Sequence, residues 1–229
     1  MKAMVLAAGL GTRLRPLTDS RPKALVEVAG RTLLEITLER LRTFGIADVI
    51  INVHHFADMM VEYLKAKGNF GMHIEISRED ALLDTGGGLK KAAWFFEEEP
   101  FILHNVDVIT TIDLHRMLQF HSEYQPLATL AVQDRKTSRY LLFDDILRLR
   151  GRQPTPHPQL RSLAFAGIHV ISPRLFRLMT EEGAFSIIDT YVRLAEEGEK
   201  ILAFRADEYK WRDVGRLEHL AQVARDLGS

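Results

Sequence analysis

Short apolar runs alternate along this chain with segments whose apolar residues recur at helical spacing. The runs predict strands, and the periodic segments predict helices, one of which ends at Gly45, a residue suited to a left-handed cap. This alternation is typical of an α/β fold with strand–helix units around a mostly parallel sheet. The predicted strands cover 2–6, 48–53, 72–77, 101–104, 127–133, 164–171 and 200–206, and the predicted helices 33–44, 57–67, 89–96, 112–121, 186–196 and 215–227.

The pattern changes over residues 135–163. Two short β-prone pieces, YLLFDD and ILRLRG (140–151), are joined by a turn, and a proline-rich loop, QPTPHPQ (153–159), follows them. We interpret this stretch as a small β-hairpin insertion in a single domain that spans 1–229.

Composition narrows the class of protein. The chain has 229 residues, 46% of them apolar, a net charge of −1 and no cysteine, which excludes thiol nucleophiles and thiolate metal sites. The near-neutral charge argues against nucleic acid as a partner, and no apolar run approaches the length of a membrane span. The apolar start MKAMVLAAG stops at Gly9, and Arg13 and Arg15 follow where a signal peptide would have its cleavage region, so we expect a cytoplasmic protein. We also expect a monomer or small homo-oligomer.

One loop concentrates the candidate chemistry. LAAGLGTRLRPLTDSRPKAL (6–25) carries Gly9 and Gly11 together with Arg13 and Lys23, directly after the first predicted strand. Glycine-rich loops in this position often hold phosphate, because bare backbone amides can close on an anion. The dinucleotide fingerprint fails because Leu14 replaces its third glycine, and the P-loop fails because no lysine follows Gly11. A connecting loop with solvated cations is the remaining alternative.

The two separated pieces, LAAGLGTRLRPLT and RPKAL, resemble the signature of the sugar-1-phosphate nucleotidyltransferases, G-x-G-T-R-x-x-P-x-T followed by P-K. The resemblance implies a Rossmann-like three-layer nucleotidyltransferase fold. It also implies attack by a sugar-1-phosphate oxygen on the α-phosphate of a nucleoside triphosphate, so these two molecules are the expected substrates. Further segments extend it: TGGGL (85–89) resembles the base-binding turn, HNVDV (104–108) and WRDVG (211–215) the two metal aspartates, and FAGIHV (165–170) the sugar-facing strand.

The resemblance assigns roles to individual residues. Arg13 and Lys23 are the expected catalytic cations, and Asp107 and Asp213 the expected ligands of Mg²⁺, the implied cofactor. Asp107 also follows an apolar strand, where ligands bind in open α/β sheets, although a helix cap and a surface turn are the plainer roles of the two aspartates. The expected nucleotide contacts are Leu6, Ala7, Ala8, Gly9, Gly11, Thr12, Glu79, Thr85, Gly86 and Gly87, and the expected sugar contacts Asn105 and Gly167.

Two groups of cationic or titratable residues stay open. Larger relatives bind the sugar phosphate with the lysine of an E-K-P motif, which is absent here, so Arg135, Lys136, Arg139, Arg161 or Lys23 alone would replace it. His54 and His55 are expected to line the sugar pocket with Asn105, and a zinc site is disfavoured for want of ligand spacing.

Within the family, LLDTGGG and the lack of a carboxyl-terminal β-helix extension favour similarity to the short N-acetylmuramate-1-phosphate uridylyltransferases. The expected reaction therefore joins UTP to a sugar 1-phosphate. Glucose-1-phosphate thymidylyl- or uridylyltransferase and heptose- or mannose-1-phosphate guanylyltransferase are the alternatives, and a non-catalytic sugar-nucleotide sensor is the alternative that is not an enzyme.

Overall fold

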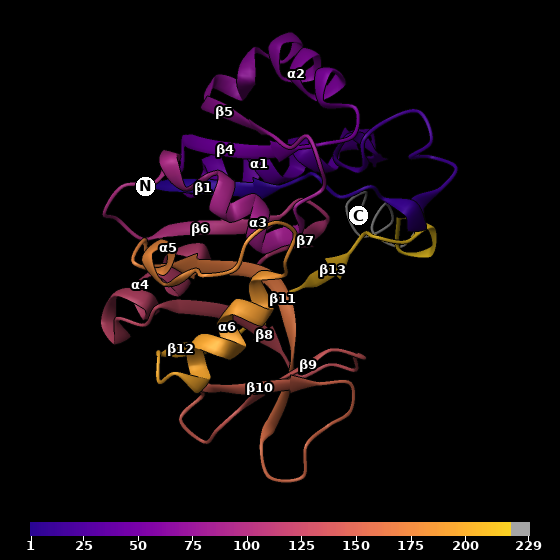
Figure 1. The fold of residues 1–229 in the computed structure, drawn as a ribbon. Helices are drawn as coiled ribbons and strands as arrows, with labels where there is room; N and C mark the ends of the chain where they lie inside the picture. Colours follow the sequence, from indigo (N-terminus) through magenta and orange to yellow (C-terminus); the bar gives the residue numbers. More distant parts are fainter. Residues whose placement is uncertain (221–229) are drawn as a thin grey trace.

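A nine-stranded sheet forms the centre of the fold in the computed structural model, which describes residues 1–220 (Figure 1). Its main path runs β10-β9-β11-β6-β1-β4-β5, and β8 joins β11 and β12 beside it. The strands are β1 (Lys2–Leu6), β4 (Asp48–Val53), β5 (His73–Arg78), β6 (Phe101–Asn105), β8 (Ala128–Gln133), β9 (Tyr140–Phe143), β10 (Leu149–Gln153), β11 (Arg161–Ile171) and β12 (Ile201–Arg205).

The parallel part of the sheet brings three strand ends together. β1 pairs in parallel with β4 and β6, and Leu6 is level with both Asn52 and Asn105. β11 runs antiparallel to β6, β8 and β9 and so connects this part to the hairpin. The carboxyl ends of β1, β4 and β6 therefore share one edge, the usual ligand edge of an α/β sheet.

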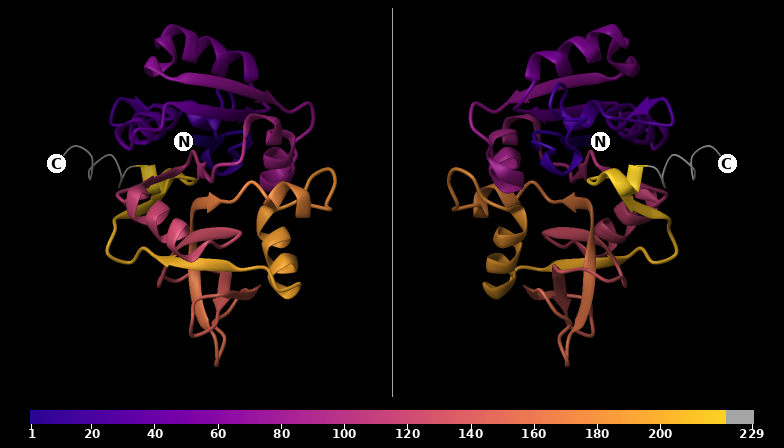
Figure 2. Two further views of the ribbon diagram at one scale, coloured as in Figure 1. Left: turned by 90° about the vertical axis from the view of Figure 1, so that its left-hand side faces the viewer. Right: turned by 90° about the vertical axis from the view of Figure 1, so that its right-hand side faces the viewer.

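Helices cover both faces of the sheet. Side chains alternate along β1, so Ala3 and Val5 join the apolar cluster under α1 (Leu33–Thr43), α2 (Ala57–Ala66) and α4 (Leu114–Tyr124). Met4 joins the opposite cluster, under α3 (Asp84–Lys91), α5 (Leu175–Leu178) and α6 (Ile187–Glu196). Figure 2 shows α4 and α6 on opposite sides of the strands. The predicted three-layer α/β class is confirmed.

Most predicted elements form where the pattern placed them, for identifiable local reasons. The Thr32 side chain accepts a 3.0 Å hydrogen bond from the backbone amide of Glu35 and starts α1, which ends just before Gly45 with its φ of +74°. Asp113 caps α4 by accepting from the amides of His115 and Arg116. β9 and β10 form the predicted hairpin, and β11 begins three residues before the predicted strand, at Arg161.

The structure corrects other predictions. α3 starts at Asp84 and ends at Lys91, with a 3₁₀ turn at Ala93–Phe95, so the expected helix over 89–96 was wrong by more than one turn at its start. Two small two-stranded sheets were not predicted: β2 (Glu27–Val28) with β3 (Arg31–Thr32), and β7 (Val108–Thr110) with β13 (Trp211–Asp213).

Of the predicted helix over 215–227, residues 221–227 lie outside the described residues. Among residues 1–220, no helix combines the length and apolarity needed to span a bilayer.

Candidate active site

The glycine-rich loop after β1 is held by contacts within the chain. The side-chain oxygen of Asn52 accepts a 2.7 Å hydrogen bond from the amide of Ala7, and the Thr18 hydroxyl donates to the carbonyl of Gly11 at 2.9 Å. Gly11 has a φ of +65°, and a Cβ there would lie 2.8 Å from Thr18 Cγ2, so both backbone and packing require glycine. These contacts hold the loop in place at the carboxyl end of β1.

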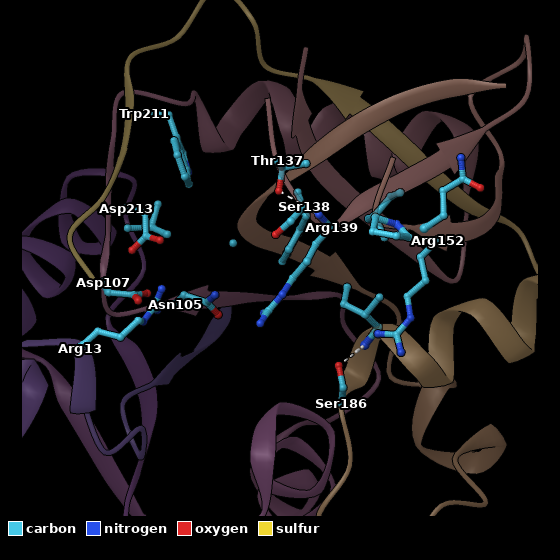
Figure 3. A pocket seen from close by; sticks show the side chains of 17 residues that line it. Arg13, Asn105, Asp107, Thr137, Ser138, Arg139, Arg152, Ser186, Trp211 and Asp213 are labelled. Carbon is cyan, nitrogen blue, oxygen red and sulfur yellow. Dashed lines mark hydrogen bonds between the residues drawn. The ribbon is translucent and has the colours of Figure 1, made fainter. Parts of the chain in front are cut away.

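Two aspartates meet beside this loop. Asp107 follows β6, and Asp213 ends β13, where it pairs with Val108, the residue after Asp107. The amide of Val214 also donates to the Asp107 carbonyl at 2.9 Å. Residues more than a hundred positions apart in the sequence therefore lie close together, Asp107 in the turn between β6 and β7 and Asp213 at the end of β13, as Figure 3 shows.

Two cations face these carboxylates. Nζ of Lys23 forms an ion pair with Asp107, and both side chains are mostly buried. A Cβ on Gly215 would lie 2.9 Å from an Arg13 Nη and 3.4 Å from Lys23 Nζ, so the absent side chain leaves room for both cations beside the 213–215 turn. The amide of Gly215 donates to Asp213 at 2.7 Å and fixes that carboxylate.

Two cavities open on this cluster. The loop-side cavity has a volume of about 530 Å³ and lies at the carboxyl end of β1. The hairpin-side cavity has a volume of about 630 Å³ and lies between the carboxyl end of β6 and the β9–β10 hairpin. They share Asn105 and Asp107. The loop-side cavity is lined by Leu6, Ala7, Ala8, Gly9, Lys23, Asn52, Leu82, Asp84, Thr85, Asn105, Val106, Asp107 and Ala184. The hairpin-side cavity is lined by Arg13, Asn105, Asp107, Val108, Thr137, Ser138, Arg139, Leu141, Arg152, Gln153, Pro154, Phe165, Gly167, Ser186, Ile188, Trp211 and Asp213.

Most of the residues singled out in the sequence lie at these cavities, but some do not. Gly11, Thr12, Glu79, Gly86 and Gly87 line neither cavity. His54 and His55 also lie away from both, and His54 bonds instead to the carbonyl of Glu79 through Nδ1.

The glycines of TGGG are not a turn before a helix, as expected, but lie within α3. A Cβ on Gly86 would lie 2.3 Å from the ring of Phe185, and one on Gly87 would lie 2.2 Å from the carbonyl oxygen of Gly183. The glycines therefore allow α3 to pack tightly against residues 183–185. Of this run, only Thr85 lines the loop-side cavity.

Glu79 is buried and bonded within the protein. Its Oε1 accepts a 2.7 Å hydrogen bond from the Asn52 side chain, and its Oε2 accepts from the amide of Leu83 at 3.0 Å. Each carboxylate oxygen therefore has a partner within the protein, and Glu79 holds Asn52 and the start of α3.

A profile of the family described as "Nucleotidyl transferase" matches residues 2–229. The chain belongs to this family. It is 34% identical over 93% of its length to the N-acetylmuramate alpha-1-phosphate uridylyltransferase of Caulobacter vibrioides, and covers 91% of that protein. It is 33% identical, over 94% of its length, to the mannose-1-phosphate guanyltransferase of Pichia angusta, of which it spans only 61%.

Solved structures support the fold assignment for this nucleotidyl transferase. The HddC protein of Yersinia pseudotuberculosis, complexed with GMP-PN, superimposes with a TM-score of 0.83 at 20% identity, with 99% of each chain covered. A UDP-glucose pyrophosphorylase complexed with UDP-glucose gives 0.85 at 18% identity, with 99% of this chain and 98% of the other covered.

Sequence reasoning missed several residues of the nucleotidyl transferase site. Asn52 is the last residue but one of β4, beside β1, so the rule that pointed to Asp107 could have pointed to it as well. Among the cations left open for the sugar phosphate, Arg139 lines the hairpin-side cavity, whereas Arg135, Lys136 and Arg161 do not. The Arg135 guanidinium stacks 3.7 Å from the centre of the Trp211 ring and donates to the carbonyl of Phe165, so it supports the cavity wall from behind.

Proposed function

We propose that this nucleotidyl transferase joins UTP to a sugar 1-phosphate, N-acetylmuramate 1-phosphate before others, to give a nucleotide sugar and pyrophosphate. One observation carries the proposal: the two cavities share Asn105 and Asp107, with Lys23 on the loop side and Arg13 on the hairpin side. A reaction between two substrates needs such a junction, where one reacting group meets the other.

In the proposed reaction, a phosphate oxygen of the sugar 1-phosphate forms a bond to the α-phosphorus of UTP. The bond from that phosphorus to the bridging oxygen of the β-phosphate breaks, and pyrophosphate leaves with the electron pair. No covalent intermediate with the protein is required. Negative charge repels the approaching partners and then builds on the leaving group, so fixed positive charge supplies much of the catalysis.

Arg13 and Lys23 would supply that charge. The planar guanidinium of Arg13 suits a two-point grip on phosphate oxygens of the leaving group, and Lys23 acts as a compact charge at the junction. Thr85 at the start of α3 and Ala7–Gly9 after β1 would hold the nucleotide in the loop-side cavity.

Asp107 and Asp213 fit a divalent cation. Residues 1–220 contain no group of three or more His, Cys, Asp or Glu side chains that could hold a metal. The donor set here is two carboxylates, Asp107 in the turn before β7 and Asp213 at the end of β13, and both are hard oxygen ligands. This donor set suits Mg²⁺, which takes one or two carboxylates and completes its shell with phosphates and water. When bound, the ion would neutralise phosphate charge.

The choice of UTP and of N-acetylmuramate 1-phosphate is supported by the Caulobacter relative, which matches nearly the whole chain. The mannose-1-phosphate guanyltransferases make GTP the second candidate, at comparable identity over part of their length.

The test measures pyrophosphate release with UTP, GTP, ATP, CTP or dTTP, each supplied separately with N-acetylmuramate, glucose or mannose 1-phosphate. We expect kcat/KM for UTP to exceed that for GTP and ATP by at least roughly tenfold, about 1.4 kcal/mol. A preference for GTP would replace the uridylyl assignment with a guanylyl one. Absence of turnover with every pair would favour a sugar-nucleotide sensor.

A further inference from the structure

The hairpin forms the outer wall of the hairpin-side cavity. Thr137, Ser138 and Arg139 lie just before β9 on this wall, and residues 152–154 lie at the end of β10. Tyr140, the next residue after Arg139, pairs with both Gln153 and Ala164. The amide of Arg139 also donates to the Thr137 hydroxyl at 3.1 Å. The backbone that carries Arg139 is therefore anchored on two sides.

The two arginines of this wall differ in their partners. Arg152 forms an ion pair with Asp189 of α6 at 2.6 Å. The side chain of Arg139 forms no ion pair or hydrogen bond with any residue of 1–220. Figure 3 shows the Arg139 side chain extending from the hairpin into the cavity, between Asn105 and Ser186. An uncompensated positive charge thus enters the space where the sugar is expected.

The surroundings of Arg139 favour an anionic partner from the ligand. The carboxylates among the lining residues are Asp107 and Asp213, and these lie at the junction with Arg13 and Lys23. A neutral sugar seated against Arg139 would remove water from the guanidinium and give it no opposite charge, which is costly. A carboxylate would restore both charge balance and hydrogen bonds.

The remaining wall suits the apolar parts of such a substituent. Leu141, Phe165 and Ile188 line the same cavity. Ser186 begins α6, and its hydroxyl accepts from the amide of Ile188 at 3.3 Å. The cavity therefore offers a cation, a polar helix start and an apolar surface opposite the phosphate junction.

We propose that Arg139 determines acceptor specificity by binding a carboxylate carried on the sugar, so that the enzyme selects acidic sugar 1-phosphates. This inference rests on the proposed nucleotidyl transfer and adds to it the residue that reads the sugar. The phosphate of the acceptor is left to the cations at the junction.

The experiment compares two acceptors that differ in one group. N-acetylmuramate 1-phosphate carries a lactyl carboxylate that N-acetylglucosamine 1-phosphate lacks. kcat/KM with UTP is measured for both acceptors in the unmodified protein and in Arg139→Gln, Arg139→Lys and Arg148→Gln. Arg148 is an exposed arginine near the hairpin turn, outside the cavity lining, and serves as the matched control.

We expect Arg139→Gln to lower kcat/KM for the acidic acceptor roughly 10- to 100-fold, the scale of a charge-assisted hydrogen bond, and to change the neutral acceptor less than about threefold. Arg139→Lys should keep part of the preference, and Arg148→Gln all of it. Equal losses for both acceptors would show that Arg139 binds the phosphate, and would overturn the proposal. A preference of the unmodified protein for the neutral acceptor would also overturn it while leaving nucleotidyl transfer intact.

Discussion

Oε1 of Glu79 accepts a 2.7 Å hydrogen bond from the side-chain nitrogen of Asn52. The other end of the same amide accepts a 2.7 Å bond from the backbone of Ala7. A buried carboxylate therefore fixes the orientation of Asn52, and Asn52 in turn fixes the backbone that follows β1. Glu79 is therefore linked to the loop-side cavity through Asn52.

Replacing Glu79 by Gln tests this relationship. In the native protein the Asn52 side-chain nitrogen and the Leu83 amide both donate to Glu79. The NH₂ group of the substituted Gln would face one of these two donors, and that hydrogen bond would be lost. We expect a loss of about 1–3 kcal/mol in the free energy of unfolding, and a rise in KM that is equal for all nucleotides. Urea denaturation and nucleotide competition measure these quantities. A changed preference among the bases would instead show that Glu79 reads the base.

The paired aspartates give a separate prediction. Asp107→Asn and Asp213→Asn each remove a hard anionic ligand but little volume, so we expect kcat to fall by about a hundredfold or more with thermal stability retained. Asp145→Asn, at an exposed aspartate of the hairpin turn, is the control and should keep its rate. Near-normal rates of either variant at saturating Mg²⁺ would refute the assignment.

The glycine-rich loop offers a matched pair of arginines. Arg13 lines the hairpin-side cavity beside the 213–215 turn, whereas Arg15 is exposed and pairs with Asp19 at 3.2 Å. We expect Arg13→Ala to lower kcat even with saturating nucleotide, because its charge is most useful as the leaving group forms. Arg15→Ala should leave kcat nearly unchanged. If Arg13→Ala raises KM alone, Arg13 only binds the nucleotide.

Gly87 is predicted to matter for stability rather than for base binding. A Cβ there would lie 2.2 Å from the carbonyl oxygen of Gly183, a backbone atom that has little freedom to move. We expect Gly87→Ala to lower the free energy of unfolding by about 1–3 kcal/mol or more. Gly9→Ala is the control, because a Cβ there meets nothing within 4 Å. Equal stability of the two variants would contradict the packing role.

Three buried histidines predict a dependence of stability on pH. Burial lowers the pKa of His104 and of His121 to about 4, and that of His169 to about 3. Below the ordinary value of 6.5, the unfolded chain binds protons that the folded protein does not, so stability falls as the pH falls toward 4. Each histidine contributes about 1.4 kcal/mol per pH unit in this window.

Urea denaturation at pH 7, 6 and 5 measures this slope. His121 accepts or donates one hydrogen bond with Thr129 at 2.9 Å, and a glutamine can replace that bond without titrating. His121→Gln should therefore reduce the slope. A free energy of unfolding that stays constant from pH 7 to pH 5 would disprove the prediction.

The sequence pattern predicts the strands and most helices because buried apolar residues recur along each element with the period of that helix or strand. It fails at α3, where three glycines of low helix propensity indicate a loop, and where contacts with Phe185 and Gly183 override that propensity. The rule that strand ends bind ligands supports the choice of Asp107, which the family resemblance also singles out. Asp213 was found only through the family resemblance, since its neighbour in space, Val108, is distant in sequence. Arg139 remained one of several candidates because only the folded hairpin shows which cations face the cavity.

β11 is long enough to contact both the parallel strands and the hairpin, through β6 at one end and β9 at the other. The junction of the two cavities and the outer wall of the hairpin-side cavity are thus attached to different parts of one strand. Changes in the length or sequence of the hairpin can reshape the hairpin-side cavity while β1, β6 and β13 keep the charged groups in place. If the proposed function holds, this architecture lets the choice of acceptor change without moving the reacting groups.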